Sequence, residues 1–195
     1  MVLPDQWKRR ELFGGAIEMC MPEAYLDMSD IGPVPDNQEV WVDGGNSLIM
    51  EIVERSELPE GEVGRFYWQD LASVSESTST RLDGQEELDV EKELPGIPSS
   101  SCPHAYLVNG CQTLTKSRQH PSQAHPVAVW LTILRLPGVQ ADLLVTANFP
   151  CTEADNDRNG SAAGRPMESE GMEGRSQVVK SMLRTLVVRD WSLFG

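Results

Sequence analysis

The chain has 195 residues, of which 39% are hydrophobic and 24% are charged, and this composition suits one folded domain with some polar segments and excludes a wholly disordered protein. Acidic residues outnumber basic residues by 30 to 16, so the formal net charge is −14. A chain of this charge repels phosphate groups, which makes nucleic acid and anionic membrane surfaces poor partners and favours a basic protein partner.

The N-terminus and the cysteines indicate an intracellular protein. The first fifteen residues contain no apolar signal core, and the longest apolar run, residues 127–134, is too short to cross a bilayer. No Cys-x-x-Cys pair occurs among the four irregularly spaced cysteines, Cys20, Cys102, Cys111 and Cys151. We therefore expect reduced thiols in a protein of the cytosol or nucleus, without membrane insertion.

The first part of the chain predicts mostly β-structure, followed by one helix. Alternating apolar residues indicate strands, Gly44-Gly45-Asn46 is a hairpin signal, and the apolar face after Pro59 is typical of a helix. In chain order, the predicted elements are a strand at 12–19, a turn or single helical turn at 24–31, a loop with two prolines at 32–37, strands at 39–43 and 47–54, and a helix at 59–71.

Two polar stretches, near residues 73–104 and 150–174, are rich in Ser, Pro, Gly and acidic residues, and we expect them to be mobile inserts. Within the first, residues 82–94 fit either a strand or a short helix. The remaining predicted elements are a strand at 105–114 with a turn or bulge at Asn109-Gly110, a hairpin of strands 127–136 and 141–149 joined by a Pro-Gly turn, and an amphipathic helix within 175–193 that starts at Ser176 and lies on the sheet. Together they predict a single α+β domain over residues 1–195, with a central antiparallel β-sheet flanked by helices.

Motifs for common enzyme chemistries are missing from the sequence. It contains no GxxxxGK[ST] loop, no GxGxxG fingerprint and no GxSxG elbow, so a P-loop nucleotide hydrolase, a dinucleotide enzyme and a hydrolase triad are not supported. A zinc site would need ligands from Cys102, His104, Cys111, His120 and His125; the pair of histidines has a suitable spacing, but the cysteines do not. We expect no catalytic residues, no metal and no cofactor.

Acidic residues are concentrated in residues 18–62, where twelve carboxylates are opposed only by Arg55. Most charge runs are solvated surface, but apolar residues interrupt this one in a strand pattern, and a field of one sign is commonly kept for a partner. Asp36 and Glu39 also flank a rigid Pro-x-Pro loop, a usual place for binding groups. The run predicts a partner-binding surface, and a glycosidase with paired carboxylates is the enzymatic alternative.

Specific motifs add to these patterns. LFGGAI at 12–17 and DMSDIGPVPDNQEVWVDGGNSLIMEIVE at 27–54 resemble the Ran guanine nucleotide release factor family, with PVPDNQEV as the most specific part. Weaker similarities follow in order at 64–72, 105–116, 134–150 and 176–195. The resemblance covers nearly all the predicted folded parts and leaves out the two polar stretches.

The resemblance implies a PsbP-like α/β/α sandwich, binding of the small GTPase Ran, release of its guanine nucleotide and a role in nuclear protein import. Such a protein is a GTPase regulator rather than an enzyme, and we expect a monomer in the nucleus and cytoplasm. A PsbP-like accessory protein that shares the fold without binding Ran is the alternative.

Position by position, the resemblance places the Ran-binding residues at Asp27, Asp30, Asp36, Asn37, Gln38 and Glu39. Gly32 departs from the family pattern, since members typically carry a basic residue there. We expect lysine at positions 36 and 39 to abolish Ran binding and leave the fold intact, because both positions are predicted to be at the surface.

Overall fold

The computed structural model describes residues 6–114, 125–151 and 167–195. It confirms the predicted α+β fold. Seven antiparallel strands form the main sheet in the order β3-β4-β5-β9-β8-β7-β6, and three form a small sheet in the order β1-β2-β10. The strands are β1 (Trp7–Leu12), β2 (Ile17–Pro22), β3 (Leu26–Asp27), β4 (Gln38–Asp43), β5 (Asn46–Glu54), β6 (Ser79–Glu87), β7 (His104–Leu114), β8 (His125–Leu136), β9 (Ala141–Pro150) and β10 (Val187–Val188).

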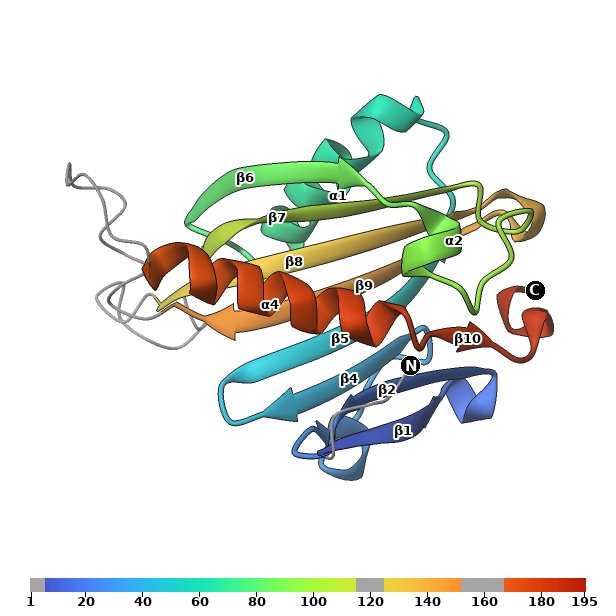
Figure 1. Cartoon of the computed structure of the whole chain (residues 1–195), viewed down its shortest axis with the longest axis horizontal. Helices are drawn as coiled ribbons and strands as arrows, with labels where there is room; N and C mark the ends of the chain where they lie inside the picture. The colour runs from blue at the N-terminus through green and yellow to red at the C-terminus, as the bar shows by residue number, and fades with distance from the viewer. Residues whose placement is uncertain (1–5, 115–124, 152–166) are drawn as a thin grey trace.

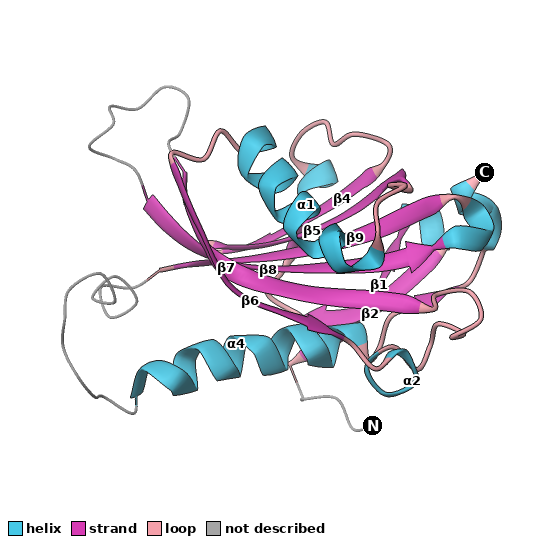
Figure 2. Cartoon of the chain, turned by 90° about the horizontal axis from the view of Figure 1, so that it is seen from above, coloured by secondary structure: helices cyan, strands magenta, loops and turns pink. Residues whose placement is uncertain are grey.

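Helices cover both faces of the main sheet. Helix α1 (Glu60–Val74) lies on one face and helix α4 (Met167–Leu183) on the other, with the short helix α2 (Val90–Glu93) beyond one end of α4 (Figures 1 and 2). The small sheet lies beside α4 and continues that layer (Figure 1). None of the helices in the described ranges combines enough length with enough apolar character to span a bilayer.

The central strands β8 and β9 bury side chains on both faces, which explains their nearly continuous apolar sequence. On β8, Leu131 and Ile133 pack with Val63 of α1, whereas Trp130 and Leu134 belong to the core under α4. The register from Leu136↔Ala141 to Val127↔Pro150 confirms the predicted antiparallel hairpin.

The single strand predicted at residues 12–19 is wrong, because the chain turns in the middle of it. Strand β1 ends at Leu12, a 3-10 turn occupies Phe13–Gly15, and β2 begins at Ile17. Gly14 and Gly15 have φ angles of 64° and 91°, which glycine adopts readily and other residues rarely do. The glycine pair therefore makes a hairpin turn, and this turn borders the candidate site.

Residues 73–104, predicted to be a mobile insert, are part of the fold. Strand β6 forms an edge of the main sheet by pairing with β7, and α2 follows it, so residues 82–94 contain both a strand and a helix. Leu94 and Cys102 are fully buried in the core. The polar composition reflects an exposed edge strand rather than an insert.

The predictions at Asn109-Gly110 and for the last helix also differ from the structure. Asn109-Gly110 lies inside β7 and makes no turn; the bulge is on β6, between Leu82 and Gly84. Helix α4 begins at Met167, before the predicted start, and ends at Leu183, after which β10 pairs with β2 and a 3-10 turn covers Trp191–Phe194. Residues 152–166 of the second predicted insert lie outside the described residues.

Candidate functional site: an acidic groove

The predicted acidic segment forms part of a groove between the β1–β2 turn and the β3–β4 edge of the main sheet. The groove encloses about 470 Å³ and is lined by Glu11, Phe13, Gly14, Asp27, Ser29, Val34, Pro35, Asp36, Gln38, Glu39 and Val40. We call it the acidic groove. Four of these described lining residues are carboxylates and none is basic. A groove with one sign of charge attracts cationic side chains.

Glu39 fixes one wall of the acidic groove. Its Oε1 accepts a hydrogen bond from the backbone amide of Phe13, which joins β4 to the β1–β2 turn. Phe13 has a φ of 50°, a conformation that is costly for a bulky residue and persists only where surrounding contacts hold it. The carboxylate is thus part of the scaffold as well as part of the charged lining.

Asp27 positions the chain where β3 borders the groove. Its Oδ1 accepts a hydrogen bond of 2.8 Å from the Ser29 amide and so caps the 3-10 turn Met28–Asp30. The preceding segment is anchored by Arg10, which donates to the carbonyl oxygens of Glu23 and Tyr25 at 3.0 and 3.1 Å. The place of Asp27 is therefore fixed by local contacts.

The amides of Asn37 and Gln38 brace the Pro-x-Pro loop. Asn37 Nδ2 donates to the Ile52 carbonyl oxygen at 3.1 Å, and Gln38 Nε2 donates to Glu51 Oε1 at 2.8 Å. Both contacts tie the loop to β5, which leaves the exposed Asp36 side chain at its tip. These amides hold the loop and are already engaged within the chain.

The structure brings together four of the six predicted site residues. Asp27, Asp36, Gln38 and Glu39 line the acidic groove, whereas Asp30 and Asn37 are exposed and do not line it. Glu11 was missed, because β1 was not predicted. The sequence signal that could have placed Glu11 at the site is its position directly before Leu12 and the glycine turn.

The environment of Glu39 corrects the expectation that it lies at the surface. It is half-buried on β4. Burial raises the pKa of the Glu39 carboxyl group, the hydrogen bond from Phe13 opposes this, and the negative charge of Asp27 adds to it. Lysine at position 39 would lose the bond to Phe13, so it does not test binding alone.

We expect Glu39→Gln to stabilise the folded protein at pH 7. A carboxyl group whose pKa is raised by folding contributes stability below its unfolded pKa, near 4.5, and loses it as the pH rises through the folded value. Glutamine removes the charge and keeps an oxygen for the Phe13 amide. Thermal unfolding at several pH values should show a gain for the variant at pH 7 that shrinks toward pH 4.5. An equal gain at both pH values would contradict a titration effect, and the exposed Asp36→Asn is the matched control.

The residues considered for zinc have other contacts. The Cys102 thiol is buried and donates to the His104 carbonyl oxygen at 3.3 Å, while the His104 ring pairs with Glu87 at 2.8 Å. Cys111 faces Cys151 instead. His120 lies outside the described residues. Within the described ranges, no three His, Cys, Asp or Glu side chains gather as metal ligands.

Comparison with known proteins identifies the same family that the sequence motifs resemble. The family model described as "Mog1: Ran-interacting Mog1 protein" matches residues 10–150. A protein of Bos taurus named Ran guanine nucleotide release factor is 31% identical over 188 residues, covering 94% of this chain and 95% of that protein. The nuclear import protein mog1 of Schizosaccharomyces pombe is 26% identical over 190 residues, covering 95% of this chain and 99% of that protein.

The fold is also found among solved structures. The crystal structure of the Saccharomyces cerevisiae Ran-binding protein Mog1p superposes with a TM-score of 0.71, covering 97% of this chain and 98% of that one. The two sequences are 21% identical, so this likeness concerns the fold alone. It agrees with the α/β/α arrangement of a central antiparallel sheet between helices.

Proposed function

Because the chain belongs to the Ran-interacting Mog1 protein family, we propose that it binds the small GTPase Ran through the acidic groove and promotes release of Ran's guanine nucleotide, in support of nuclear protein import. The observation that supports this site is the set of four carboxylates on one groove without a basic described lining residue. We further propose that the protein acts as a monomer in the nucleus and cytoplasm and does not bind nucleic acid or insert into membranes.

Nucleotide release needs no bond chemistry in this protein, which we propose to be a regulator rather than an enzyme. A partner that binds the nucleotide-free GTPase more tightly than the loaded form shifts the equilibrium toward release by the difference in binding free energy. The groove carboxylates can supply this difference, because basic side chains that hold nucleotide phosphates gain an alternative anionic partner once the phosphates leave.

A nucleotide-exchange assay tests the function. Ran loaded with a fluorescent guanine nucleotide should lose it faster when this protein is added, and the acceleration should fall as the salt concentration rises, because attraction between exposed charges is screened. No acceleration at saturating, demonstrably bound protein would reject the release activity while leaving binding in place.

Two exposed apolar side chains beside the acidic groove should contribute to the same interface. Leu26 and Ile31 are 61% and 68% exposed and flank the turn that holds Asp27. Apolar side chains within a charged surround commonly provide most of an interface's affinity. We expect Ile31→Ser to weaken Ran binding about tenfold, from the loss of about 1.4 kcal/mol, with no loss of thermal stability.

Titration calorimetry with Ran measures this effect. Val74→Ser is the matched control, because Val74 is 76% exposed at the end of α1, away from the groove. Equal affinity for the two serine variants would remove Ile31 from the interface.

A further inference from the structure

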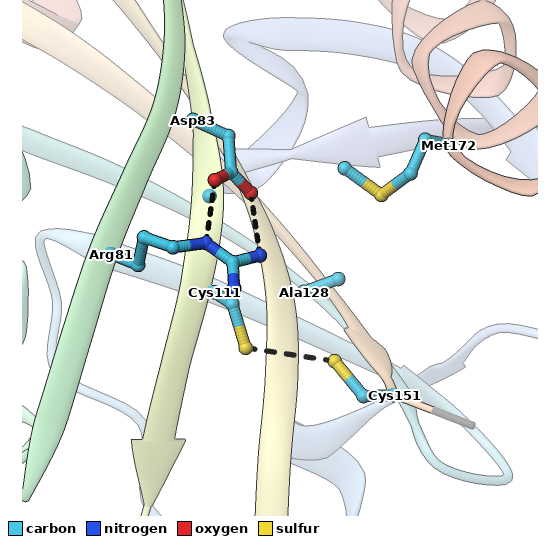
Figure 3. Close-up of a pocket in the computed structure, with 7 residues that line it drawn as sticks. Arg81, Asp83, Cys111, Ala128, Cys151 and Met172 are labelled. Atoms are coloured by element: carbon cyan, nitrogen blue, oxygen red, sulfur yellow. Dashed lines mark hydrogen bonds and ion pairs between the residues drawn. The ribbon is translucent and has the colours of Figure 1, made fainter. Parts of the chain in front are cut away.

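Two cysteine side chains face each other on the side of the main sheet covered by α4. The Sγ atoms of Cys111, on β7, and Cys151, directly after β9, are 3.7 Å apart (Figure 3). Strand β8 lies between them, and the residue opposite Cys111 on β8 is Ala128. Because alanine carries only a methyl group, the two sulfur atoms can approach each other above β8.

The thiol pair borders a small hollow through which an oxidant can reach it. A small hollow of about 20 Å³, lined by Arg81, Asp83, Cys111, Cys151 and Met172 among others, gives room for a water-sized molecule. Arg81, on β6, is the direct cross-strand partner of Cys111, and both side chains line the hollow (Figure 3). Asp83 pairs with Arg81 at 2.6 Å, so an ion pair stands at the hollow beside the two thiols.

We propose that Cys111 and Cys151 are an oxidisable thiol pair that a peroxide converts into an intramolecular disulfide. The Cys111 thiolate attacks one peroxide oxygen and breaks the O–O bond, which gives a sulfenic acid and, after protonation, water. The Cys151 thiolate then displaces the hydroxyl group from that sulfur, and a second water forms. In total, two thiols are oxidised to one disulfide and one hydrogen peroxide is reduced to two waters.

Closing the disulfide requires Cys151 to move. The two cysteines lie on positions separated by a whole strand, and a disulfide spans a shorter distance than two strand spacings. Cys151 follows the last residue of β9, where its amide donates to the Pro126 carbonyl oxygen at 3.0 Å. Shifting this end residue over Ala128 costs that hydrogen bond, whereas moving Cys111 would disrupt the pairing of β7 with both β6 and β8.

The disulfide would join positions forty residues apart and so reduce the freedom of the unfolded chain. We therefore expect the oxidised protein to unfold at a temperature several degrees above that of the reduced protein. This rise in unfolding temperature should depend only on Cys111 and Cys151, because the other two cysteines, Cys20 and Cys102, are buried.

The test treats the full chain with hydrogen peroxide, blocks remaining thiols with an alkylating agent and measures the intact mass and the protease fragments. The wild type should lose the mass of two hydrogens, leave two thiols for alkylation and yield a fragment joining residues 111 and 151. Cys111→Ser and Cys151→Ser should lose that fragment and the rise in unfolding temperature, whereas Cys102→Ser should keep both.

Three outcomes would overturn the proposal. The first is a protein that gains oxygen atoms at Cys111 or Cys151 without forming the cross-link. The second is a disulfide between two molecules, seen as a dimer on a non-reducing gel. The third is a cross-link that includes Cys20 or Cys102.

Discussion

Replacing Arg135 with methionine should lower the free energy of unfolding by about 3–5 kcal/mol, because the Asp142 carboxylate would stay buried without a countercharge. The two side chains are 1% and 0% exposed and face each other across the β8–β9 hairpin. Urea denaturation followed by tryptophan fluorescence measures the change, and the transition midpoint should fall to a much lower urea concentration.

Several groups depend on this buried pair. The Tyr67 hydroxyl donates to Asp142 Oδ2 at 2.7 Å, and the guanidinium of Arg135 donates to the hydroxyl and carbonyl oxygens of Ser56, both at 2.8 Å. The pair therefore connects the hairpin with α1 and with the segment that enters α1. Losing Arg135 removes the countercharge of Asp142, three hydrogen bonds (two to Ser56 and one to Asp142) and an ion pair with Glu60, whereas losing Tyr67 removes one hydrogen bond.

A second variant separates an isolated buried charge from a general loss of packing. Arg135→Met combined with Asp142→Leu removes both charges, so it should recover much of the stability lost in the single variant. Arg9→Met breaks an ion pair with Glu18 in which Arg9 is 64% exposed, and it should leave the midpoint nearly unchanged. If Arg135→Met left the midpoint as unchanged as the surface control does, the buried Arg135–Asp142 pair would not contribute to stability as proposed.

The features that were predictable from the sequence are those with strong local patterns. The β8–β9 hairpin was predicted because two apolar runs flank Pro137-Gly138, and α1 because apolar residues recur on one face after Pro59. The sequence left residues 82–94 open between a strand and a short helix, because β6 is an exposed edge strand and few of its side chains are apolar. Its place follows from pairing with β7, which is a tertiary contact and leaves little trace in local sequence.

The candidate site shows the same limit. The acidic residues near the Pro-x-Pro loop were predicted from their motif, but Glu11 reaches the groove only because Gly14 and Gly15 reverse the chain. Asn37 was assigned to the partner, although its amide binds the chain itself. A sequence motif therefore predicts which segment lies at the site. It does not predict the contacts of each side chain, because those depend on which strands pair next to that segment.

Combining Asp36→Lys with Asp27→Asn should weaken Ran binding about 100-fold, or about 3 kcal/mol, because charge pairs at the centre of an interface contribute strongly to affinity. Asp36 is exposed, and no side-chain hydrogen bond or ion pair involves it within the described residues. Asparagine at position 27 keeps an oxygen for the Ser29 amide. Both substitutions therefore change the charge of the groove and keep the hydrogen bonds that shape it.

The matched control makes the same change of net charge on α1, with Asp70→Lys and Glu62→Gln, both exposed positions. Calorimetry with Ran should give wild-type affinity for this control, and unequal affinities at equal net charge would locate the effect in the groove. Equal losses for both variants would indicate long-range attraction by the whole chain of net charge −14. The two cases also differ in salt dependence: if the groove pairs directly with basic side chains, added salt should weaken the wild type more than the groove variant, because the variant has already lost the pairs that salt screens.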